Sequence, residues 1–380
     1  MDRRILILIW IGLGMALILP GCTREKKPTQ VEGKGNLRVR LDLTPAEQTA
    51  GGDIPAESIL VEIKSKLITQ SAYTDQDGSV SFNNLVSDLY TIGFSKEYMQ
   101  NMMLGGGGSA YVESYQLIDT LLEGYLVSPG LKINEIFAAW SENDILYYND
   151  PFIELYNATD DTLYVDGMLV IRGGSADLKC TDVDNDGEIE NFVAIWRFPG
   201  VPVINAPPYN RTRGDYPIAP RSYLVLATDA RDHTQYVPNS IDLSNADWEF
   251  VNKLDYADLD NPSVPNIFSL ETDSKADFML NGVTDILLLC SGADAGANEN
   301  PNYPYGWQDG IALETILDGV EYHSSLTSKK VMDTRVDKGF TGVGISTYSG
   351  KSMQRIKPGF DTDNSTIDFM ILSKPTPGYQ

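Results

Sequence analysis

Short stretches in which apolar and polar residues alternate constrain this chain more than any other feature of its sequence. Every odd position of residues 37–43 is leucine or valine, the even positions are arginine or aspartate, and residues 59–63 repeat the apolar spacing. Successive side chains of a β-strand point to opposite faces of a sheet, so a period of two predicts half-buried strands. We therefore expect an all-β protein.

The N-terminal segment has a different composition from the rest of the chain. Arg3 and Arg4 precede a stretch of fifteen mostly apolar residues at 5–19. A membrane span needs about 20 apolar residues, so this stretch is typical of a cleaved signal peptide. Its ending at residues 19–22, Leu-Pro-Gly-Cys, resembles the bacterial lipobox and implies that the chain is cut before an acylated Cys22. The alternative is an ordinary signal or an uncleaved anchor with an accidental cysteine.

Acylation at Cys22 implies that the folded chain lies outside the cytoplasm. Each buried methylene of an acyl chain contributes about 0.8 kcal/mol, so several chains hold a protein firmly on a membrane. After the signal peptide at 1–21, residues 22–35 are polar, without apolar periodicity, and predict an unstructured tether. We expect a lipid anchor in the outer membrane, with the periplasmic face and the cell surface both left open.

Charge and cysteine content limit the partners and the covalent structure. The net charge of −24 repels the phosphate backbone, so we expect no nucleic-acid partner. After cleavage and acylation only Cys180 and Cys290 remain as thiols. In an oxidising compartment they either form one disulfide or lie in the core as two small hydrophobic residues.

The first folded part carries a characteristic turn. An Asp-Gly turn at residues 74–82 lies between strand-like segments and is followed by Leu85 and the apolar run 89–94. This order resembles the prealbumin-like β-sandwich shared by carboxypeptidase regulatory-like and Cna-B-type domains. The resemblance implies such a domain at residues 36–128.

A run of four glycines at 105–108 falls within this first domain. Glycine has no side chain to pack and adopts many backbone conformations. The run therefore predicts a flexible loop or a break in a strand, without a ligand-binding role.

The second part of the chain opens and closes with recognisable segments. Residues 133–136 read Ile-Asn-Glu-Ile, residues 152–157 read Phe-Ile-Glu-Leu-Tyr-Asn, and residues 352–355 read Ser-Met-Gln-Arg before a Thr-Pro-Gly ending. These segments resemble the lamin-tail domain, an immunoglobulin-like β-sandwich, in an enlarged form found in Bacteroidetes-type lipoproteins without an assigned function. The resemblance implies that residues 130–380 form a larger β-sandwich with long loops.

Short catalytic motifs with a known structural mechanism are missing. The sequence contains no Gly-x-Ser-x-Gly elbow, His-Glu-x-x-His helix, Walker loop or Cys-x-x-Cys pair, and only two histidines, His233 and His323. We therefore expect that the protein is not an enzyme. The alternatives are an envelope hydrolase that uses paired carboxylates, and a purely structural spacer.

One acidic turn has the spacing of a calcium loop. Acids at its first, third and fifth positions can point three oxygens at one ion, because glycine at the sixth position allows a tight turn. A backbone carbonyl and a later acid can add further ligands. The candidate ligands are Asp182, Asp184, Asp186, Glu188 and Glu190. The twelfth position is Val193, where an EF-hand has glutamate, so an exposed acidic turn without calcium remains the alternative.

Taken together, these features predict a membrane-anchored lipoprotein of the cell envelope that acts as a noncatalytic binding or adhesion module. Its N-terminal acyl chains contact the membrane, the first domain acts as a spacer, and the loops of the second contact a ligand. The ligand class stays open between a protein, a glycan and a metal complex delivered to an outer-membrane transporter. Calcium is the one cofactor that the sequence suggests.

Overall fold

A computed structural model describes residues 33–99, 102–127, 129–142, 149–174, 179–200, 214–252, 258–270, 277–292 and 310–378 of the protein. Strands dominate this part of the chain, and its α-helices are the short α1 (Thr44–Ala50) and α2 (Ser365–Asp368). The all-β prediction is therefore confirmed. No helix among these residues is long and apolar enough to cross a membrane. The predicted signal peptide, Cys22 and the tether up to residue 32 lie outside the described residues.

Residues 35–127 form two sheets that face each other, here called the N-terminal sandwich. One sheet has the order β4 (Ser79–Leu85), β1 (Gly35–Asp42), β7 (Leu117–Glu123). The other has the order β3 (Thr69–Tyr73), β2 (Leu60–Lys64), β5 (Asp88–Met99), β6 (Met102–Val112), β8 (Tyr125–Val127). β1 is antiparallel to β4 and parallel to β7.

The alternating residues of this sandwich point inward as their spacing predicts. Leu37 and Val39 of β1 are fully buried and pack with Val61 of β2 and Phe94 of β5, whereas Arg40 points to solvent. Burial of such a side chain stabilises the fold by roughly 1.5–3 kcal/mol, so the register of each strand is fixed by its apolar face.

The Asp-Gly turn joins the two sheets of the sandwich. It follows β3 in one sheet and precedes β4 in the other. The Asp75 carboxylate accepts hydrogen bonds from the backbone N–H groups of Asp77 and Ser79, and Gly78 adopts φ 70°. Glycine suits this left-handed position because it has no Cβ.

The chain from residue 131 onward forms one eleven-stranded sheet, here called the large sheet. In spatial order its strands are β21 (Ile316–His323), β19 (Thr284–Cys290), β12 (Leu169–Arg172), β14 (Ala194–Arg197), β18 (Asn266–Ser269), β17 (Trp248–Val251), β16 (Tyr223–Ala227), β10 (Phe152–Asn157), β9 (Leu131–Phe137), β22 (Ser352–Arg355) and β23 (Phe369–Leu372). β17 is parallel to β16 and β18, and the other neighbours are antiparallel. Two further pairs join β11 (Leu163–Tyr164) to β15 (Pro217–Ile218) and β13 (Glu188–Ile189) to β20 (Ile311–Ala312).

The large sheet curls around an aromatic core. β21 contacts β9 although the two lie far apart in the strand order. The rings of Phe250 and Phe278 stack at 3.7 Å, and Trp196 meets both edge-on. Other side chains cover the outer face: Val170 joins this core, while Ile171 packs in a second apolar cluster. Burial on both faces explains the continuous apolar runs in several strands.

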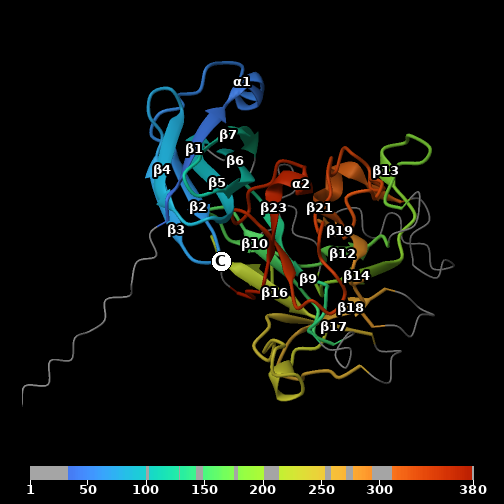
Figure 1. Ribbon diagram of the computed structural model, residues 1–380. Coiled ribbons are helices and arrows are strands. Elements are labelled where there is room, and N and C mark those ends of the chain that lie inside the picture. Colours follow the sequence, from blue (N-terminus) through green and yellow to red (C-terminus); the bar gives the residue numbers. More distant parts are fainter. Residues whose placement is uncertain are drawn as a thin grey trace, which may run out of the picture.

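The prediction of a loop or strand break at the glycine run is wrong. Residues 105–108 lie in the middle of β6 and pair one by one with β5. The segment between β22 and β23 covers the outer face of these strands: a Cβ at Gly105 would lie 2.6 Å from the Phe360 ring, and one at Gly107 would lie 2.8 Å from Ile356. Side chains are absent here because the two bodies approach closely, as Figure 1 shows for α2 and β23 beside β6.

Candidate functional site

The acidic turn brings four of its predicted carboxylates together. One oxygen from each of Asp182, Asp184, Asp186 and Glu190 lies within 4.8 Å of the others. Glu188 belongs to β13, outside this group of side chains. A backbone bridge between Thr181 and Glu190 closes the turn, so residues at both of its ends face the same space.

Hydrogen bonds and one arginine already engage part of this acidic turn. The carboxylate of Asp182 accepts the backbone N–H groups of Asp186 and Gly187, each at 3.1 Å. Arg335 pairs with Asp182 at 2.7 Å and holds the pKa of its carboxyl below the ordinary value. Burial and the neighbouring aspartates raise the pKa of Glu190. A cation bound in the turn would therefore compete with Arg335 for Asp182.

Cys180 and Cys290 are buried in the same apolar cluster, and no disulfide joins them in the structure. Burial, followed by the charge of Asp285, raises the pKa of the Cys180 thiol far above its ordinary value. Such a thiol is a poor nucleophile, because the thiolate is the reactive form.

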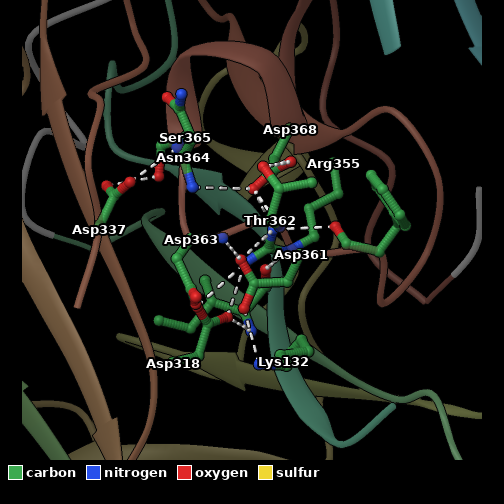
Figure 2. A network of polar contacts seen from close by, with 12 residues as sticks. Lys132, Asp318, Asp337, Arg355, Asp361, Thr362, Asp363, Asn364, Ser365 and Asp368 are labelled. Carbon is green, nitrogen blue, oxygen red and sulfur yellow. Dashed lines mark hydrogen bonds and ion pairs between the residues drawn. The ribbon is translucent and has the colours of Figure 1, made fainter. Parts of the chain in front are cut away.

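A buried ionic network ties the C-terminal strands to the rest of the large sheet (Figure 2). The guanidinium of Arg355, 1% exposed, donates to both oxygens of Asp318 and also contacts Asp361 and Asp368 at 3.2 and 3.3 Å. Lys132 pairs with Asp361 at 2.7 Å. The network thus joins β9, β21 and β22 to the segment that precedes β23.

The charges in this network are unequal. At Asp318 and Asp368, burial raises the pKa by more than the charge of Arg355 lowers it. The resulting pKa values are about 6 and about 7. Despite the same burial, Arg355 and Lys132 hold the pKa of Asp361 well below its usual range. These carboxyl groups have less than a tenth of their surface exposed, so the network orients the chain around residues 356–368 and does not face a substrate.

A second pair of carboxylates lies across β9 and β10. Glu135 and Glu154 are opposite each other in the register, and both are fully buried. Glu135 accepts the backbone N–H of Thr376, and Glu154 accepts that of Gly378 at 2.5 Å. This pair binds the C-terminal Thr-Pro-Gly segment, and its full burial keeps both acids away from the surface that a glycoside substrate would reach.

The two histidines also serve local contacts. His233 hydrogen-bonds the backbone oxygen of Asp229 at 3.0 Å. The His323 ring hydrogen-bonds Thr284 at 2.8 Å and Glu321 at 2.6 Å. This order of hydroxyl, imidazole and carboxylate resembles a catalytic triad. Thr284 and His323 are direct cross-strand neighbours of β19 and β21, however, so the sheet itself produces their contact. Glu321 is further engaged by the backbone N–H of Met332.

An apolar groove lies beside the contact between the N-terminal sandwich and the large sheet. Its volume is about 440 Å³. Its walls include Leu89 from β5, Phe369 from β23, and the loop residues Leu326, Phe340 and Val343. Leu326 is 78% exposed and Val343 is 39% exposed. Ligand sites occur preferentially in such apolar hollows between domains, so this interdomain groove is the candidate ligand site. The sequence could not reveal it, since its two walls come from different folded bodies.

The fold and these sites define an all-β protein of two joined bodies, with an acidic turn and an interdomain groove. Residues 219–303 match the model of a family described as a protein of unknown function, DUF4876. A crystal structure of a DUF4876 family protein from Bacteroides thetaiotaomicron is similar, with a TM-score of 0.52 and 20% identity, covering 88% of this chain and 94% of that one. The two chains share their fold.

The full-length major pilin SpaD from Corynebacterium diphtheriae reaches a TM-score of 0.19 at 10% identity, covering 37% of this chain and 41% of the pilin. No curated protein matches the chain.

Proposed function

We propose that this protein is a noncatalytic binding module of the cell envelope, anchored in the outer membrane by acyl chains on Cys22. The observation that carries the proposal is a lipobox-like segment at residues 19–22 ahead of two folded bodies packed tightly on each other. A short tether leaves the bodies close to the membrane, and their fixed orientation presents one groove to a ligand. The ligand is a protein, a glycan or a metal complex passed to an outer-membrane transporter.

The anchor is tested by labelling cells with radioactive palmitate and separating their membranes. We expect label in the wild-type protein and its recovery with the outer membrane. Cys22→Ser removes the acylated thiol and abolishes the label, whereas the neighbouring Thr23→Ser retains it. A wild-type protein that takes up no palmitate, or that fractionates with the cytoplasm, contradicts the proposal.

The interdomain groove is the proposed contact for the ligand. A photoreactive amino acid at Val343, in the groove, tests this in intact cells against one at Leu67, which is 61% exposed and outside it. We expect a discrete cross-linked species from Val343 and none from Leu67. Equal cross-linking at both positions would show that the groove has no special role.

We further propose that the acidic turn binds calcium with modest affinity. The four converging carboxylates support this assignment, and the pairing of Arg335 with Asp182 limits the affinity. Calorimetric titration with calcium chloride should show binding that Asp184→Ala weakens by at least tenfold. Asp77→Ala, in another exposed turn, is the matched control. The assignment fails if Asp184→Ala leaves the heat unchanged.

A further inference from the structure

Three aspartates from separate loops meet beyond one edge of the large sheet. Because β17 is parallel to both β16 and β18, all three strands end at this edge. Asp229 follows β16, and Asp258 and Asp277 follow β17 and β18. One carboxylate oxygen from each lies within 4.8 Å of the others. The three are distant in sequence, so only the parallel arrangement brings them together.

One of these carboxylates has an oxygen without a partner. Asp229 is 1% exposed, and its Oδ2 accepts the side-chain N–H of Asn149 at 2.5 Å. Its Oδ1 is buried and accepts no hydrogen bond from a described residue. A buried carboxylate oxygen is costly unless a proton, a donor or a cation meets it. Burial, together with the charges of Asp258 and Glu249, raises the pKa of Asp229 to about 7.

The loops that carry Asp229 and Asp258 are held in place before any ligand binds. The buried carboxylate of Glu249 on β17 accepts the backbone N–H of Ala230 at 2.6 Å and that of Asn261 at 2.7 Å. The Asn261 side chain in turn donates to the Ala230 carbonyl at 2.8 Å. This clamp keeps two acidic groups close although their charges repel each other. Such support is what a preformed ligand site requires.

The chemistry of the cluster favours one class of ligand. Carboxylate oxygens are the ligands of hard divalent cations, and calcium lies 2.3–2.6 Å from its oxygens. Two oxygens on opposite sides of one calcium ion are therefore about 4.8 Å apart. The oxygens of the three aspartates lie within this distance of one another. A cavity of about 680 Å³ reaches the cluster at Asp258 and gives an ion a route from solvent.

We propose that Asp229, Asp258 and Asp277 form a calcium site that joins the loops after β16, β17 and β18. The ion fills the space beside the unpartnered oxygen of Asp229 and neutralises the repulsion among the three carboxylates. This site is separate from the acidic turn and does not depend on it or on the interdomain groove. Its location within residues 219–303 places it in the segment that matches the DUF4876 family.

The experiment titrates the full chain, freed of metal with a chelator, with calcium chloride in a calorimeter. An Asp184→Ala background removes the acidic turn from the measurement. In this background we expect one calcium per chain, and Asp229→Asn should lower the affinity by at least tenfold. Asp260→Asn, which makes the same charge change on an exposed residue of the Asp258 loop, should leave the affinity unchanged.

Thermal unfolding separates loss of the site from loss of the fold. In chelator the Asp229→Asn protein should unfold at the same temperature as its parent or higher, because a buried charge is gone. Calcium should raise the midpoint of the parent and of Asp260→Asn, but not that of Asp229→Asn. The proposal is overturned if the folded Asp184→Ala chain binds no calcium, or if Asp229→Asn binds it equally well.

Discussion

The buried position of Glu154 shifts the pKa of its carboxyl upward. Its side chain is fully buried in β10, and burial raises the pKa of its carboxyl from 4.5 to about 8. Asn134 and Gly378 donate hydrogen bonds to it, which lowers the pKa by less than burial raises it. The folded state thus holds a proton that the unfolded chain releases above pH 4.5, so this residue makes the fold less stable as pH rises toward 8.

Glu154→Gln should remove this pH dependence. Glutamine has nearly the same shape and carries no charge to bury. Its carbonyl oxygen can accept one of the two hydrogen bonds, and its NH2 group, which only donates, replaces the oxygen that accepts the other. Between pH 4 and pH 9 the free energy of unfolding of the variant should rise relative to that of the wild type by on the order of 5 kcal/mol. Urea unfolding across this range measures the difference. The exposed Glu113→Gln serves as control, and a gap that does not grow with pH contradicts the prediction.

Arg355 contacts three buried carboxylates and compensates their charges. Lys132 pairs with Asp361. Arg355→Met would leave Asp318, Asp361 and Asp368 buried with only the lysine nearby. Loss of one partner from a buried ionic network costs about 3–5 kcal/mol, which urea unfolding detects. Arg38→Met removes a partly exposed arginine paired with Asp119 near the surface and should have little effect. Equal losses for both variants would show that burial of the network is unimportant.

At the scale of elements, β6 shows why a glycine run can form a strand. Its backbone pairs with β5, and the absence of side chains lets Phe360 and Ile356 lie against it. Gly105→Val should therefore destabilise the protein by about 1–3 kcal/mol, because the new side chain overlaps the Phe360 ring. Ser109→Val adds the same side chain at an exposed position of the same strand and should change little. Chemical denaturation of both variants measures the contrast.

The sequence predicted those strands whose pattern of buried and exposed residues can be read from neighbouring positions in the chain. The alternation at residues 37–43 predicted β1, and the Phe-Ile-Glu-Leu-Tyr-Asn segment coincides with β10. The glycine run was misread because its packing partner lies about 250 residues later in the chain. The cluster around Asp229 escaped prediction for a similar reason, since nothing in the sequence states that β17 is parallel to β16 and β18. Only the acidic turn, with all its acids within nine residues, was visible beforehand.

At the scale of the whole molecule, the N-terminal sandwich and the large sheet share an interface. Ile356 fills the space over Gly93 and Gly107, and the ion pair of Lys357 with Glu62 at 3.3 Å flanks this contact. The Arg355 network anchors the same segment on the other side (Figure 2). The interface therefore couples the two cores, and we expect the wild-type protein to unfold in a single cooperative transition.

Ile356→Asp should uncouple the two bodies. The substitution places a charge against the glycine strands, where it loses its hydration, and the flanking Lys357 is already paired with Glu62. Differential scanning calorimetry should then resolve two transitions, one for each body, where the wild type shows one. Leu67→Asp introduces the same charge at an exposed position of the N-terminal sandwich and should preserve the single transition. If Ile356→Asp also unfolds in one step at the wild-type midpoint, the contact does not couple the bodies, and the groove between them is not held in a fixed shape.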